Sequence, residues 1–255
     1  MSLVLTALEG IPMIHPGDDL AKIIFKSVTF SGISLLDGDI LVVAQKIVSK
    51  AEGRLVNLAS VEPSDSAIKL AVYAEKDPRL IELNLRESNE VLRVRAGTLI
   101  VEHHLGFVCA NAGIDHSNVA GEPSSNEEWV LLLPENPDES ARNLRDKLQD
   151  ISGAGLGVMI IDSHGRAWRL GTVGTAIGLA GVPGVVDLRG RPDLFGYKLR
   201  ITEVGAADEL AAAASLVMGQ ADENTPVVHA RGFPYALRES SVKEILRPKE
   251  QDLFR

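Results

Sequence analysis

Short runs of apolar residues, separated by polar and glycine-rich segments, give the first indication of structure. Unbroken runs of this length predict buried strands. We expect such strands at residues 3–8, 40–44, 106–110, 129–133, 155–161 and 227–232. Residues 91–95 and 98–102 instead alternate between apolar and polar positions on either side of Gly97, which predicts two further strands joined by a turn.

Helices are predicted where a capping residue precedes apolar residues at helical spacing. One short helix is predicted to begin at Leu20, and others cover residues 65–75, 79–90, 138–149 and 208–217. Charges are spread around the helices at 65–75 and 79–90, so we expect these two to form an outer layer. A chain of 255 residues with this mixture can form one large α/β domain or two small ones.

The charge balance excludes some classes of function. With 26 basic and 35 acidic residues, the net charge is −9, so the chain lacks the basic surface of a nucleic-acid-binding protein. It can still bind an anionic nucleotide if metal ions or local lysine and arginine side chains supply positive charge. The sequence has neither a basic leader nor a run of about 18 apolar residues, so we expect a cytoplasmic protein that binds no membrane. The single cysteine, Cys109, lies in an apolar run and is expected to be a core residue, not a nucleophile.

Two acidic residues follow apolar runs, and we expect each to lie at the end of its strand. Asp115 comes after the run at 106–110, and Asp162 comes directly after the run at 155–161. Taken singly, each is explained by an Asx turn, which is a common structure. Both have hydroxyl or amide neighbours, however, and carboxylate, hydroxyl and amide oxygens are the ligands that Mg²⁺ or Mn²⁺ prefers. The pair therefore favours a phosphate–metal site at the rim of a sheet.

Lys46 and Lys50 follow the apolar run at 40–44 and lie four residues apart. A helical turn would place both ammonium groups on one face. Two solvated lysines would explain the same pattern, because lysine is a common surface residue. Their position directly after a buried strand slightly favours contact with a phosphate.

Several polar or glycine-rich segments lie between the predicted elements. Residues 120–128 are polar and turn-rich, and form a candidate mobile loop or lid. Six glycines fall within residues 165–184 and permit close approach of the backbone to another chain segment or to a ligand, but they match no phosphate-binding fingerprint. Residues 218–226 form a further loop with oxygen ligands, and the charged tail from about Glu239 is expected to be peripheral.

Four stretches together resemble one enzyme family. They are residues 9–14, 43–54, 111–119 and 160–166, and residues 171–178, 193–197 and 218–223 add supporting matches. The chain resembles the GTP-dependent ligases that add L-glutamate to coenzyme F420-0, over residues 3 to about 233. Some relatives carry a fused nitroreductase-like domain, whereas this chain is expected to be the stand-alone form, with residues 1–255 as a single domain.

The resemblance implies an α/β (α+β) fold with mixed sheets and outer helices, assembled as an intertwined homodimer. It implies two ions, Mg²⁺ or Mn²⁺, with K⁺ as a further candidate. Asp115 and Asp162 would hold one ion, and Ser163 and Gln220 would help to hold the second. Relatives often have Thr in place of Ser163, which is a conservative difference. Some relatives have Glu in place of Gln220, and the neutral amide in this chain should bind the second ion more weakly than their carboxylate.

The resemblance also implies which residues contact GTP. These are Ile11, Pro12, Met13, Ile14, Gln45, Lys46, Lys50, Asn118, Met218, Gly219, Gln220, Ala221, Asp222, Glu223, Asn224 and Thr225. Asp115, Asp162 and Arg166 are the expected catalytic residues. Arg166 and Arg169 are our own candidates for binding the phosphodiester or carboxylate of the substrate, because arginine pairs with such groups through two hydrogen bonds.

Three interpretations of function remain open. The first is ligation of L-glutamate to F420-0 through an acyl phosphate. The second keeps this chemistry but uses dehydro-F420-0 or another carboxylate as the acceptor. The third is a nucleotide-binding regulatory protein without catalysis, for which the amide of Gln220 is the only indication.

Overall fold

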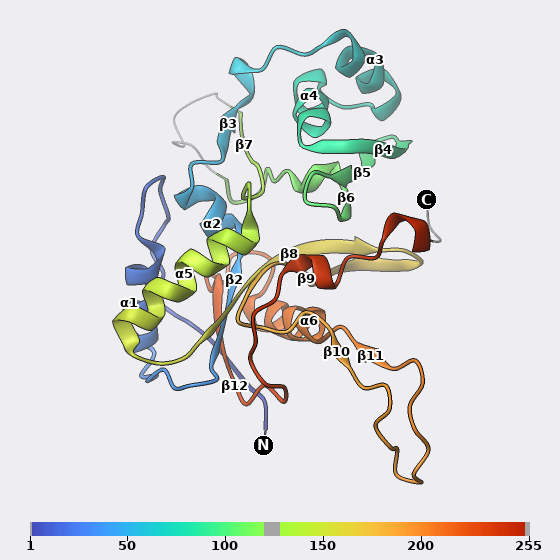
Figure 1. Cartoon of the computed structure of the whole chain (residues 1–255). Helices are drawn as coiled ribbons and strands as arrows, with labels where there is room; N and C mark the ends of the chain where they lie inside the picture. The colour runs from blue at the N-terminus through green and yellow to red at the C-terminus, as the bar shows by residue number, and fades with distance from the viewer. Residues whose placement is uncertain (1, 120–127, 253–255) are drawn as a thin grey trace.

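A mixed five-stranded sheet forms the centre of the computed structural model, which describes residues 2–119 and 128–252 (Figure 1). In order across the sheet, its strands are β1 (Val4–Ala7), β12 (Val227–Arg231), β2 (Ile40–Ala44), β8 (Gly157–Arg166) and β9 (Arg169–Ala180). β2 and β8 are parallel, and the other neighbouring pairs are antiparallel. The expectation of a mixed sheet is therefore confirmed.

Both faces of this sheet are covered by helices. Successive side chains of a strand point to opposite faces, and in β2 Leu41 and Val43 belong to one hydrophobic cluster while Ile40 and Val42 belong to another. The first cluster includes side chains from α1 (Leu20–Phe30) and α5 (Pro137–Ser152), and the second includes side chains from α6 (Ala206–Met218). β2 is thus buried on both sides, which explains its unbroken apolar sequence.

A smaller antiparallel sheet lies above the central one in Figure 1. It contains β4 (Ser88–Arg95), β5 (Thr98–His103) and β6 (Val108–Ala110), with α3 (Asp65–Ala74) and α4 (Pro78–Arg86) beside it. The helix predicted over residues 79–90 extends further than the helix α4 in the structure. It ends at Arg86, because Ser88 and Glu90 pair with His103 and Glu102 of β5 and extend the sheet instead.

Short elements connect the two sheets and extend from them. They are α2 (Gln45–Ala51), the pair β3 (Leu55–Asn57) and β7 (Trp129–Leu131), and the pair β10 (Val186–Asp187) and β11 (Glu203–Val204). Short 3-10 helices cover Leu58–Ser60, Asn111–Gly113, Val242–Glu244 and Lys249–Gln251. The chain between β10 and β11 forms an arm that projects away from the body of the molecule (Figure 1). The candidate lid at 120–128 lies outside the described residues, apart from Glu128.

The glycine-rich run forms most of β9, and two of its glycines allow neighbouring elements to approach closely. A Cβ atom on Gly174 would lie 2.5 Å from the carbonyl oxygen of Ala211 in α6. A Cβ atom on Gly178 would overlap the carbonyl oxygen of Pro137, at the start of α5. The predicted close approach is therefore confirmed as contact between chain segments.

The C-terminal tail packs against the rest of the protein, although its many charges predicted a peripheral segment. Val242 is buried, and its backbone N–H donates to the carboxylate of Asp138 at 3.1 Å. Lys249 forms an ion pair with Glu90 at 2.8 Å. The prediction of a peripheral tail is thus wrong up to Lys249, because both apolar and charged side chains anchor it. None of the helices within residues 2–119 and 128–252 combines the length and apolar character needed to cross a bilayer.

Candidate functional site

A cavity of about 860 Å³ opens where β2 ends and α2 begins. Its lining combines segments that are distant in sequence: the loop before α1, the start of α2, the segment around Asp115, the middle of β8 and the loop after α6. All of the residues predicted for the site line this cavity except Ile11, Arg166 and Arg169. Ile11 is buried and belongs to the hydrophobic core.

Asp115 is presented by a short left-handed turn. The turn covers Asn111, Ala112 and Gly113, whose φ angles are 51°, 52° and 64°. Non-glycine residues in this conformation cost roughly 1–2 kcal/mol each, so surrounding structure must hold them. Backbone hydrogen bonds in both directions between Asp115 and Leu131 provide part of that support, at 3.0 and 2.9 Å.

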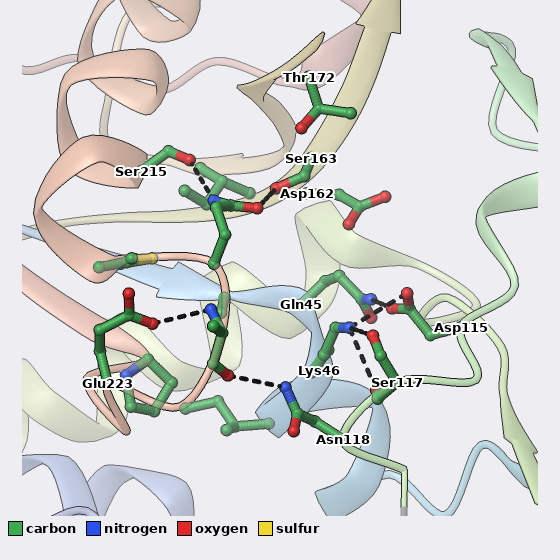
Figure 2. Close-up of a pocket in the computed structure, with 18 of the residues that line it drawn as sticks. Gln45, Lys46, Asp115, Ser117, Asn118, Asp162, Ser163, Thr172, Ser215 and Glu223 are labelled. Carbon is green, nitrogen blue, oxygen red and sulfur yellow. Dashed lines mark hydrogen bonds and ion pairs between the residues drawn. The ribbon is translucent and has the colours of Figure 1, made fainter.

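The carboxylate of Asp115 contacts two residues from the start of α2. Gln45 donates its Nε2 to Oδ2 at 2.6 Å, and Lys46 places its Nζ 3.1 Å from Oδ1 (Figure 2). Burial raises the pKa of Asp115, and the nearby charge of Asp162 raises it further, while Lys46 and Gln45 act in the opposite direction. Two carboxylates close enough to disfavour each other's charge form a site that attracts a cation.

Asp162 lies within a strand, so the prediction that it ends a strand is wrong. β8 continues to Arg166 because β9 pairs with it along this length, including Asp162 with Thr175 and Gly165 with Thr172. The apolar run stops at Asp162 only because the sheet becomes partly exposed there. The result still places the carboxylate of Asp162 at the cavity (Figure 2).

The two lysines of α2 both face the cavity. Lys50 is only 8% exposed, and its Nζ donates to the backbone carbonyl of Asn118 at 2.7 Å. Burial lowers the pKa of Lys50, and the charge of Lys46 adds to this effect. Lys46 is partly buried and also contacts the hydroxyl of Ser117 at 3.1 Å. The alternative of a solvated lysine is therefore wrong for Lys50.

Gln220 joins β8 to α6 through two hydrogen bonds. The hydroxyl of Ser163 donates to Oε1 of Gln220 at 2.9 Å, and Nε2 of Gln220 donates to the hydroxyl of Ser215 at 2.9 Å (Figure 2). Ser163 and Gln220, predicted to share a metal ion, are thus direct neighbours. Ser215 was not predicted, because nothing in the sequence links a helix position to a strand so far away.

The loop after α6 is fixed to other parts of the cavity wall. The carboxylate of Glu223 accepts the N–H of Ala221 at 2.8 Å, and such backbone hydrogen bonds lower the pKa of Glu223. Asn118 donates its side-chain amide to the carbonyl of Ala221 at 3.1 Å. Asn224 donates to the carbonyl of Ile11 at 3.4 Å. The predicted nucleotide-binding segments therefore contact one another.

Arg166 lies on the hairpin between β8 and β9, beyond the cavity lining. Its guanidinium donates to the carbonyl of Gly171 at 3.1 Å. Its catalytic role, and the role of the exposed Arg169 in binding substrate, stay predictions. Cys109 is buried, which confirms the expectation that it is a core residue, and burial raises the pKa of its thiol to about 12.

The donors in the cavity fit a hard divalent cation that also binds phosphate. In the described part of the chain, no three His, Cys, Asp or Glu side chains are arranged so that they could hold a metal ion by themselves. The predicted ligands among the lining residues are instead two carboxylates, a hydroxyl and an amide oxygen, from Asp115, Asp162, Ser163 and Gln220. Mg²⁺ is commonly held by one or two carboxylates, with water and substrate phosphate oxygens as the remaining ligands.

Comparison with known proteins shows the family of the chain. The family model for F420-0:gamma-glutamyl ligase matches residues 10–232. A coenzyme F420:L-glutamate ligase from Methanothermobacter thermautotrophicus is 47% identical over 257 residues, covering 100% of both chains. Proteins of the same name from Methanopyrus kandleri and Archaeoglobus fulgidus are 45% and 43% identical, covering 97% of this chain and 97% and 94% of theirs. The chain belongs to the F420-0:gamma-glutamyl ligase family.

Proposed function

We propose that this protein is a GTP-dependent ligase that joins L-glutamate to the carboxylate of coenzyme F420-0. One observation carries the proposal: two adjacent carboxylates, Asp115 and Asp162, share a cavity with the buried ammonium group of Lys50 and with Lys46. Phosphoryl transfer depends mainly on positioning and on neutralising phosphate charge, and this combination suits both tasks. The names of the relatives, coenzyme F420:L-glutamate ligases, support L-glutamate as one substrate and a form of coenzyme F420 as the other.

The nucleotide would bind at the end of the cavity that is formed by Pro12, Met13 and the loop at 218–225. Its phosphates would then extend towards Lys46 and Lys50. The hydrogen bond that joins this loop to Asn118 supports such a role, because it holds the two walls of the subsite together.

Asp115 and Asp162 would hold one divalent ion, and Ser163 and Gln220 would contribute to a second. When bound, such ions neutralise phosphate charge and polarise the transferred phosphoryl group. The amide of Gln220 offers only a carbonyl dipole, so the second ion should bind more weakly than the first.

The reaction would proceed in two balanced steps. A carboxylate oxygen of F420-0 attacks the γ-phosphorus of GTP, which forms an acyl phosphate and releases GDP. The amine of glutamate then attacks the acyl carbon, the C–O bond to phosphate breaks, and the amide, inorganic phosphate and a proton are released. Lys46 and Lys50 would stabilise the phosphate charge during the first step, which requires no serine or cysteine nucleophile.

The F420-0 carboxylate would enter from the end of the cavity formed by Gly165 and Thr172. This end lies at the β8–β9 hairpin, which carries Arg166 and Arg169. These two arginines are our candidates for the anionic groups of F420-0, either within one subunit or across a homodimer.

A homodimer is part of the proposal. Leu170 on the hairpin and Leu194, Phe195 and Ile201 on the arm are almost fully exposed. Apolar side chains of this size gathered on projecting segments are typical of an interface. Light scattering should give the mass of a dimer for the wild type, and a Leu194→Asp, Phe195→Asp variant should give a smaller mass.

The test of function is an assay of purified protein with GTP, Mn²⁺, K⁺, L-glutamate and F420-0, with products identified by mass. A product larger by one or more glutamate residues supports the proposal. Turnover with dehydro-F420-0 alone would indicate a different acceptor. Binding of GTP without any turnover would indicate a regulatory protein and would contradict the proposal.

A further inference from the structure

His164 lies two residues after Asp162 in β8, so both side chains point to the same face of the strand. The Nε2 atom of His164 is 3.0 Å from Oδ2 of Asp162, and the two side chains are 12% and 13% exposed. Nε2 is buried and has no hydrogen-bond partner, although it lies this close to Oδ2. The two groups are nevertheless in close electrostatic contact, and both line the cavity.

The imidazole ring is held in place by the smaller sheet. The ring of Phe107 lies with its centroid 5.1 Å from that of His164. Phe107 is itself buried and stacks on His103, with ring centroids 5.3 Å apart. The position of the imidazole is therefore set by packing, independently of Asp162.

Asp162 needs such a partner more than Asp115 does. Asp115 has both oxygens engaged, one by Gln45 and one by Lys46. Asp162 lies near the negative charge of Asp115, which would push its carboxylate away from a shared cation. A donor on Oδ2 opposes this displacement and leaves Oδ1 available to a ligand.

We propose that His164 is a positioning residue for Asp162. A small rotation of either side chain would let its Nε2–H donate to Oδ2 and hold the carboxylate in the orientation that binds the divalent ion. This inference rests on the proposed metal role of Asp162. Partners of metal ligands typically change metal affinity by about 10–100-fold when they are removed, without touching the metal themselves.

The experiment measures Mn²⁺ affinity directly, by the electron paramagnetic resonance signal of free Mn²⁺, in two matched variants. His164→Phe keeps an aromatic ring against Phe107 but removes the donor. His164→Gln loses the ring but can place an amide N–H near the position of Nε2. We expect the Mn²⁺ dissociation constant to rise roughly 10–100-fold in His164→Phe and to stay close to the wild-type value in His164→Gln.

Three controls make the outcome decisive. Asp162→Asn establishes which part of Mn²⁺ binding depends on that carboxylate, and His104→Gln reports the effect of changing an exposed histidine nearby. Thermal unfolding checks that each variant is folded. Unchanged affinity in a folded His164→Phe would overturn the positioning role, as would equal losses in the Phe and Gln variants, which would indicate packing alone. If Asp162→Asn binds Mn²⁺ as wild type does, the proposed metal site itself is wrong, and this inference falls with it.

Discussion

Gln45 donates its side-chain amide to Asp115 at 2.6 Å, across a separation of 70 residues in the sequence. The donor is the first residue of α2, and the acceptor follows the left-handed turn after β6. The contact therefore connects the central sheet to the smaller sheet at the position where the proposed chemistry occurs.

Asp115→Asn should remove activity without unfolding the protein. Burial raises the pKa of this carboxyl group, so its charge is not what stabilises the fold. An amide of the same shape should leave the melting temperature nearly unchanged, while Mn²⁺-dependent nucleotide binding and ligation are lost. Calorimetric titration and thermal unfolding of the same sample provide both measurements. Normal turnover in this variant, or in Asp162→Asn, would contradict the metal assignment.

Lys50→Met should weaken GTP binding without lowering the stability of the fold. The variant removes a cation from the proposed phosphate subsite, so GTP binding should weaken by about 1.5–3 kcal/mol, the usual size of a hydrogen bond to a charged group. Burial lowers the pKa of Lys50, which means that the folded protein holds a poorly solvated ammonium group. An apolar side chain of similar length should therefore leave the free energy of unfolding unchanged or slightly higher.

The matched control is Lys22→Met, at an exposed lysine on α1 that pairs with Asp19. It should change both quantities by less than about 0.5 kcal/mol. Lys46→Ala is a second test of the subsite and should raise the KM for GTP or lower kcat. Wild-type kinetics in both Lys50 and Lys46 variants would remove these residues from the site.

Gln220→Glu should strengthen the second metal site. A carboxylate offers a full negative charge in place of a carbonyl dipole, so activity should saturate at a lower metal concentration than in the wild type. The gain should shrink as the pH falls towards the ordinary glutamate pKa of about 4.3, because protonation removes the added charge. Metal titrations of activity compare the two proteins, with Asp162→Asn as the inactive control. Superimposable curves would mean that Gln220 contacts only the nucleotide.

Gly113→Ala should destabilise the turn that presents Asp115. Gly113 has a φ of +64°, and an added Cβ would lie 2.7 Å from a methyl carbon of Leu133. Backbone strain and overpacking together should lower the free energy of unfolding by about 2–4 kcal/mol. Gly97→Ala is the control, because Gly97 has a φ of +79° but open space around it. Urea denaturation of Gly97→Ala should show a free energy of unfolding that is lower by only about 1 kcal/mol. Equal losses in the two variants would mean that overpacking against Leu133 does not contribute.

His103 should make stability depend on pH. Burial lowers its pKa from 6.5 to about 4, and its Nδ1 accepts the N–H of Leu105 at 3.0 Å, which favours the neutral ring. The unfolded chain takes up this proton first, so the stabilisation is complete above pH 6.5 and is lost as the pH falls towards 4.

The loss from this one group should be on the order of 3 kcal/mol at its largest. Glu87, which lies 3.8 Å from Nε2, would reduce it. His103→Asn retains an acceptor near the position of Nδ1 but does not titrate in this range. Urea denaturation at several pH values should therefore show a weaker pH dependence in the variant. Identical slopes for the two proteins would exclude His103 as the source.

The sequence analysis located lining residues of the cavity best where polar residues come directly after a buried strand. Lys46 and Lys50 both line the cavity, because α2 begins at the residue after β2 and its helical spacing brings both side chains to one face. The loop at 218–225 was also found, since a glycine and several polar residues end the preceding helix.

The prediction failed where a partner strand, not the local sequence, decides the structure. The apolar run stops at Asp162, but pairing with β9 extends β8 to Arg166. This extension places Arg166 on the hairpin outside the cavity. It also places His164 beside Asp162, a relationship that period-two alternation would have indicated if the strand had been expected to continue.

The parallel pairing of β2 with β8 has a consequence for how the protein folds. Ala44 pairs with Ile161, and the whole smaller sheet, α2 and α5 lie in the chain between the two strands. Closing so long a loop is entropically unfavourable and has to precede the contacts that stabilise it. During synthesis, Lys46 and Lys50 therefore leave the ribosome long before Asp162 exists, and the cavity that they line can only assemble late, after the intervening segment has become compact.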